Sequence, residues 1–62
     1  MKFKIEIDLT NPAFADGEAG DELARILHNL ASAIEDEITY IGPVEYRLMD
    51  KNGMRTGTAS IA

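Results

Sequence analysis

The chain has 62 residues, with 11 Asp and Glu against six Lys and Arg, a formal net charge of −5, and no cysteine or tryptophan. A chain of about 60 residues buries only ~60% of its unfolded surface, so we expect one small domain over residues 1–62. The lack of cysteine excludes disulfides and thiolate chemistry, and the acidic balance argues against nucleic acid as a partner. Since no apolar run approaches the ~20 residues of a membrane span, we expect a cytoplasmic protein with no membrane partner.

The first predicted element is a strand over Lys2–Leu9, where polar and apolar residues alternate strictly. A period of two indicates a strand with one buried face. The side chains expected to face the core are Phe3, Ile5, Ile7 and Leu9. Asn11 before Pro12 is then typical of a capped turn, and Phe14 is predicted to cover the core.

A helix is predicted to begin near Ala19–Asp21, because apolar residues then recur with the helical period. They form one stripe, which consists of Leu23, Ile26, Leu27, Leu30, Ala31, Ile34 and Ile38. Two positions are possible for the end of this helix. The helix stops after Glu37, where strand-forming residues follow, or continues to Ile41, which lies on the stripe before the stop signal Gly42-Pro43.

Two further strands, Val44–Met49 and Met54–Ala62, are predicted to form a hairpin. Asn52-Gly53 is a strong signal for a two-residue turn, because both residues tolerate a positive φ. That turn sets Asp50 opposite Arg55 on the outer face. It also sets Val44, Tyr46 and Leu48 opposite Ile61, Ala59 and Gly57 on the inner face, with Gly57 leaving room for Leu48, and puts Thr56, Thr58 and Ser60 outside.

These elements predict an α+β fold of order β-α-β-β, with one amphipathic helix packed on a three-stranded, largely antiparallel sheet. One helix leaves one sheet face open to solvent, which antiparallel sheets tolerate. The handedness of the crossover leaves the strand orders 1-3-2 and 3-1-2 open, and we favour 1-3-2. Two free edges and a small core also leave open a homodimer through an edge or through the open face.

The residues capable of chemistry form no arrangement typical of an enzyme. His28 is the single histidine and has no recognisable nucleophile or base partner, so we expect no catalytic residues. The segment Asp50–Gly53 is similar to the start of a calcium loop, but Met54 and Gly57 stand where oxygen ligands are required. We therefore expect neither a metal nor a cofactor.

Charge is unevenly distributed: residues 6–37 hold nine acidic residues and one basic residue, whereas the remainder holds two and five. Acids near the helix start favour the helix dipole, and Asp21 is predicted to pair with Arg25 four residues later. The run Glu35-Asp36-Glu37 opposes the dipole. This run of acids either increases solubility or binds a partner with a basic surface. The candidate partner-binding residues are Asp21, Glu22, Arg25, Glu35, Asp36 and Glu37.

Several stretches resemble the short open reading frames that are common in tailed bacteriophages and prophages. They are Asn11-Pro12-Ala13-Phe14-Ala15-Asp16, Glu22-Leu23-Ala24-Arg25-Ile26-Leu27 with Leu30-Ala31, and Leu48-Met49-Asp50-Lys51-Asn52-Gly53 with Gly57. The likeness covers most of the chain. It implies a viral protein in the host cytoplasm, of the kind that binds and blocks host proteins, as anti-CRISPR and other anti-defence factors do.

The leading hypothesis is therefore non-enzymatic binding to a macromolecular partner, a host or phage protein with a basic surface. The alternative is a structural or self-assembling dimeric module, in which the charge serves only solubility. A third hypothesis is weak nucleic-acid binding through Lys2, Lys4, Arg47 and Arg55.

Overall fold

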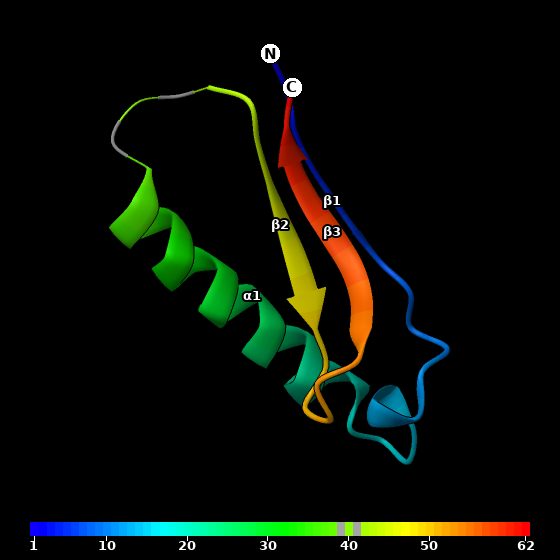
Figure 1. The fold of residues 1–62 in the computed structure, drawn as a ribbon. Helices are drawn as coiled ribbons and strands as arrows, with labels where there is room; N and C mark the ends of the chain where they lie inside the picture. Colours follow the sequence, from blue (N-terminus) through cyan, green and yellow to red (C-terminus); the bar gives the residue numbers. More distant parts are fainter. Residues whose placement is uncertain (39, 41) are drawn as a thin grey trace.

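The computed structural model describes residues 1–38, 40 and 42–62, which form one α-helix and one three-stranded sheet (Figure 1). The elements are β1 (Phe3–Ile7), the 3-10 turn η1 (Pro12–Phe14), α1 (Ala19–Glu37), β2 (Val44–Met49) and β3 (Arg55–Ile61). β3 is central and pairs antiparallel with both neighbours, in the order β1-β3-β2. The α+β class, the order of elements and the favoured strand order are confirmed.

The helix lies against β2 and leaves most of β1 uncovered, although Ile7 at the end of β1 is half-buried against the core. Figure 1 shows α1 on the β2 side of the sheet and β1 along the opposite edge. On the inner face, Leu48 and Ala59 are 5% and 0% exposed, but Phe3 and Ile5 are 46% and 43% exposed. The prediction that Phe3, Ile5 and Leu9 lie in the core is wrong. A helix about 10 Å wide covers only two strands that lie ~4.8 Å apart. Here the covered strands are β2 and β3.

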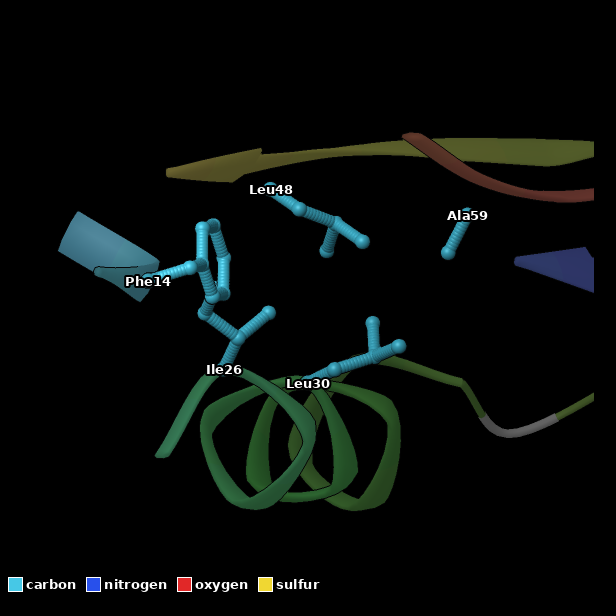
Figure 2. Close-up of a cluster of buried hydrophobic side chains, with 5 residues drawn as sticks. All are labelled: Phe14, Ile26, Leu30, Leu48 and Ala59. Carbon is cyan, nitrogen blue, oxygen red and sulfur yellow. The ribbon is translucent and has the colours of Figure 1, made fainter. Parts of the chain in front are cut away.

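The core is a cluster between α1 and the sheet, drawn in Figure 2. Ile26 and Leu30 point from the helix toward Leu48 and Ala59 of the sheet, and Phe14 closes one end of the cluster. The members are buried: Phe14, Ile26, Leu30, Leu48 and Ala59. The apolar stripe predicted for the helix is therefore buried only along its centre, because Leu23 and Ile34 are half-buried and Leu27 and Ala31 are exposed.

The segment before the helix is the capped turn that the sequence predicts. The side chain of Asn11 accepts a hydrogen bond from Ala13 N at 2.8 Å, and Pro12 occupies the first position of η1. Phe14, at the end of this turn, is 6% exposed and packs against the core. Its predicted role as a cover is confirmed.

The helix α1 begins at Ala19, as predicted, and ends at Glu37. Ile38 caps it, with its backbone N–H donating to Ile34 O at 3.0 Å. Of the two ends left open by the sequence, the structure has the earlier one. The predicted stripe position at Ile41 lies outside the described residues. Among those residues, no helix combines the length and the apolar character needed to cross a membrane.

The β2–β3 hairpin has the predicted register but a different turn. The loop is three residues long, Lys51–Gly53, and within it only Gly53 has a positive φ, of 80°. Asp50 N donates to Met54 O at 2.8 Å and Gly53 N donates to Asp50 O at 3.0 Å. The two-residue turn and the pairing of Asp50 with Arg55 are wrong. The confirmed pairs are Val44–Ile61, Tyr46–Ala59 and Leu48–Gly57.

A bulge at Thr56 accommodates the changed turn. The register shifts between the pairs Leu48–Gly57 and Met49–Arg55, so Thr56 has no counterpart in β2. Thr56 is buried, its hydroxyl donates to the carbonyl of Asp8 at 2.7 Å, and its own carbonyl accepts from Asp8 N at 2.8 Å. The prediction that Thr56 lies on the outer face is wrong, because the bulge interrupts the alternation. Thr56 fixes the end of β1 instead.

Gly57 permits a close approach of the β1 backbone. A Cβ at this position would collide with the carbonyl oxygen of Glu6 and would lie 2.9 Å from the Cα of Ile7. The prediction that Gly57 makes room for Leu48 is wrong. The space is required by β1 on the other side of β3.

Candidate functional site

The residues predicted to bind a partner lie at the two ends of α1. Because an α-helix rises 1.5 Å per residue, Asp21 and Glu35 lie about 21 Å apart along its axis. The structure therefore divides the candidates into an N-terminal group and a C-terminal group, and it does not bring the two together. The groups are Asp21, Glu22 and Arg25, and Glu35, Asp36 and Glu37.

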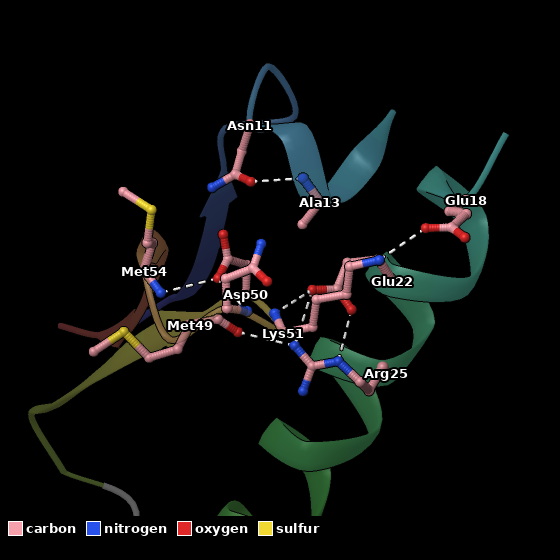
Figure 3. A network of polar contacts seen from close by, with 10 residues as sticks. Asn11, Ala13, Glu18, Glu22, Arg25, Met49, Asp50, Lys51 and Met54 are labelled. Carbon is pink, nitrogen blue, oxygen red and sulfur yellow. Dashed lines mark hydrogen bonds and ion pairs between the residues drawn. The ribbon is translucent and has the colours of Figure 1, made fainter. Parts of the chain in front are cut away.

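Glu22 belongs to the interior of the protein. It is 5% exposed, and its carboxylate accepts hydrogen bonds from Arg25 Nε at 2.6 Å and Nη2 at 3.0 Å, and from Lys51 N at 2.7 Å (Figure 3). The hydrogen bonds from Arg25 hold the pKa of Glu22 below its ordinary 4.5, and the N–H of Lys51 acts in the same direction. Glu22 therefore joins the helix start to the hairpin loop.

Arg25 and Lys51 extend this connection, which Figure 3 shows as one polar network. Arg25 Nη2 also donates to the carbonyl of Met49 at 3.2 Å, and Lys51 Nζ donates to Glu18 at 2.8 Å. The carboxylate of Glu22 raises the pKa of Arg25. In the described structure Arg25 pairs with Glu22, and the predicted pair with Asp21 is wrong. Pairing with the residue three positions earlier turns the guanidinium toward β2.

Asp50 stabilises the hairpin loop from within. It is 4% exposed, and its Oδ1 accepts from the backbone N–H of Asn52 at 2.8 Å and of Met54 at 2.9 Å. The N–H of Met54, followed by the side chain of Asn11, lowers the pKa of Asp50 below its ordinary 3.8. This side chain competes for the loop amides, which explains why the loop is longer than Asn52-Gly53 alone indicates.

The C-terminal group is exposed and separate from this network. In residues 1–38, 40 and 42–62, no hydrogen bond or ion pair involves a side chain of this group, which we call the terminal acids: Glu35, Asp36 and Glu37. Since successive helical residues are rotated by about 100°, the terminal acids surround the last turn and do not line one face. They oppose the helix dipole and repel one another. The fold gives no reason for them.

Glu37 is the terminal acid whose charge acts on Tyr46 of β2. Burial raises the pKa of Tyr46, and the charge of Glu37 acts in the same direction. The hydroxyl of Tyr46 is buried and has no hydrogen-bond partner among the described residues. This links the end of the helix electrostatically to the inner face of β2.

The basic residues of the strands lie among acidic ones. On the open sheet face, the register aligns Lys4 with Glu45 across Ser60, and Glu6 with Arg47 across Thr58.

Shallow hollows of about 250 and 220 Å³ lie beside α1, lined in part by Arg25 and by residues of β2 or the hairpin loop. In the part of the chain that the structure describes, no group of three His, Asp or Glu is placed to hold a metal ion.

Comparisons with protein-family models, with curated proteins and with solved structures find no match for this chain. Its function is therefore inferred from its own sequence and structure. Of the N-terminal group, Glu22 and Arg25 are engaged in the fold and only Asp21 is exposed. The spacing of Glu22 and Arg25 is visible in the sequence, but the bond from Glu22 to the distant Lys51 is not.

Proposed function

We propose that the protein acts by binding, without catalysis, a macromolecular partner with a basic surface, and that the terminal acids of α1 make the contact. The observation that carries this proposal is the contrast between the two ends of the helix. At the start, Glu18 and Glu22 stabilise the fold through Lys51 and Arg25. At the end, three exposed carboxylates lower the stability of the helix, and such charges attract and orient an oppositely charged partner.

The resemblance to short phage proteins supports a host protein as the partner. A phage protein present in the host cytoplasm meets nucleases and other defence proteins, whose nucleic-acid grooves are lined by Lys and Arg. Occupation of such a groove by the acidic end of α1 would exclude its nucleic acid, which is inhibition of the anti-CRISPR kind. The contact would bury the last turn of α1 and leave the polar network around Glu22 intact.

The proposal is tested by capture from lysates of infected and uninfected bacteria. Wild-type protein is expected to retain a specific host protein, identified by mass spectrometry, and E35K/D36K/E37K is expected not to. Binding should also weaken steeply between 50 and 300 mM salt, on the order of tenfold or more, because exposed charges are screened. Equal capture by wild type and by the triple variant would contradict the proposal.

A matched pair of single variants separates the site from the net charge. Asp36→Lys and Glu45→Lys each change the net charge by two, and both residues are exposed, one at the end of α1 and one on the open face of β2. With the captured partner purified, Asp36→Lys should reduce the affinity much more than Glu45→Lys does. Equal losses would indicate that only the overall charge matters.

A further inference from the structure

The free edge of β1 combines exposed apolar side chains with backbone groups that pair with no described strand. Phe3, Ile5 and Leu9 are 46%, 43% and 52% exposed, although Ala59, which lies opposite Ile5 in β3, is fully buried. No described element covers this part of the inner face, since α1 lies against β2 (Figure 1). An open edge that carries apolar side chains is a surface on which another strand pairs readily.

The hydrogen bonds to β3 show which backbone groups point to the free edge. Lys2 and Ala62 exchange both backbone bonds, at 2.8 and 3.1 Å, and Asp8 N donates to Thr56 O. Hydrogen-bonded pairs alternate along an antiparallel ladder, so the even-numbered residues of β1 face β3. The odd-numbered residues, Phe3, Ile5 and Ile7, therefore direct their N–H and C=O groups outward. A second strand on this edge must bond to these three residues.

We propose that the free edge of β1 pairs antiparallel with β1 of a second copy of this chain, about a two-fold axis at Ile5. Charge complementarity supports this occupant and this register. Lys4 then lies opposite the partner's Glu6, and Lys2 lies opposite the partner's Asp8. The symmetry produces each pair twice, so that every charged residue of this strand meets the opposite charge on the outer face.

The inner face is equally complementary in this register. Phe3 lies opposite the partner's Ile7, and the Ile5 residues of the two copies lie opposite each other. Both pairs join outward-directed backbone groups, so the hydrogen bonding and the apolar contacts agree. The result is a six-stranded sheet with both helices on one face and the exposed apolar residues of β1 at its centre.

Charge excludes the neighbouring symmetric registers. An axis at Lys4 would place the two Lys4 side chains opposite each other, and an axis at Glu6 would do the same with the two Glu6 side chains. Moving the axis by two residues in either direction pairs lysine with lysine or acid with acid. Axes at Lys4 and Glu6 also create opposite-charge pairs, but each places one like-charge pair on the axis itself. Like charges directly opposite in a sheet are unfavourable, so only the axis at Ile5 pairs every charged residue with its opposite and keeps apolar contacts on the other face.

Sedimentation velocity over a dilution series tests the proposal with charge exchange. Wild type should form a species of twice the 6.8 kDa chain mass that dissociates on dilution. Lys4→Glu replaces two attractive pairs by two repulsive ones, and so does Glu6→Lys, so each should weaken self-association roughly tenfold or more. Mixing these two variants should restore a dimer, because every cross-strand pair in the mixed dimer is again opposite in charge. The double variant K4E/E6K should also dimerise.

Controls separate the interface from folding and from net charge. Far-UV circular dichroism of each variant alone establishes that it is folded, and dimer formation on mixing shows this independently. Glu45→Lys changes the charge on β2 and should leave the dimer unchanged. Asp36→Lys changes the proposed partner site and should also leave the dimer unchanged. A failure of the dimer proposal therefore does not contradict the proposed partner site. Monomeric wild type at millimolar concentration, or a dimer that is insensitive to Lys4→Glu and Glu6→Lys, would overturn the proposal.

Discussion

β1 and β2 carry the same alternating pattern at opposite edges of one sheet, but only β2 is covered. Leu48 on β2 is 5% exposed, whereas Ile5 on β1 is 43% exposed. The helix lies on the β2 side, where a polar network joins Glu22 and Arg25 of α1 to Met49, the last residue of β2, and to Lys51 in the hairpin loop. Alternation thus reports which face of a strand is apolar, but the anchoring of the helix decides which strand is buried.

The largest expected effect comes from truncating matched side chains on the two strands. Leu48→Ala leaves a cavity in the core and should reduce the free energy of unfolding by about 2–5 kcal/mol. Ile5→Ala removes a half-exposed side chain and should cost about 1 kcal/mol. Urea denaturation at low protein concentration measures both. Similar losses for the two variants would contradict the difference in burial between the strands.

An intermediate effect is expected at Gly57, where β3 approaches β1. Gly57→Ala introduces a Cβ that collides with the backbone of Glu6, so the unfolding free energy should fall by about 1–3 kcal/mol or more. Amide hydrogen exchange should then increase across the β1–β3 ladder and less across the β2–β3 hairpin. Gly20→Ala is the control. A Cβ there meets nothing within 4 Å, and alanine should stabilise α1 by up to about 1 kcal/mol.

The smallest expected effect is the pH dependence of the network beside β2. The pKa values of Glu22 and Asp50 are lowered in the folded protein, so their contribution to stability is fully present above their ordinary values of 4.5 and 3.8. It is lost as the pH falls through the lowered, folded-state values. Thermal denaturation between pH 6 and pH 2 should show this loss, and it should be smaller in E22Q/D50N. An unchanged slope in the double variant would contradict the role of the network.

Much of the fold follows from local sequence signals. The alternation of the strands, the helical stripe and the pair Asn11-Pro12 each depend on neighbouring residues, and the structure confirms the elements they predict. The hairpin turn is different, because the buried side chain of Asp50 competes with the Asn52-Gly53 signal. The resulting bulge at Thr56 depends on that competition and could not be read from periodicity.

The candidate site was predictable only where it is independent of tertiary contacts. The terminal acids are exposed, as expected of charges that oppose the helix dipole. Glu22, by contrast, is buried through a bond to Lys51, which lies 29 residues later in the chain. No local pattern contains that contact. The same contact joins the start of the helix to the hairpin loop, on the side of the sheet away from β1.

The pairing of β1 with β3 also has a consequence for the order of folding. Phe3 pairs with Ile61, so closing this ladder requires ordering nearly the whole chain, whereas β2 and β3 are joined by a three-residue loop. The entropy of closure grows with loop length, and contacts between distant residues form slowly. We therefore expect β1 to be the last strand to join the sheet. Until it does, both edges of the hairpin are open, and β1 of another molecule can take the same place on β3 by domain swapping.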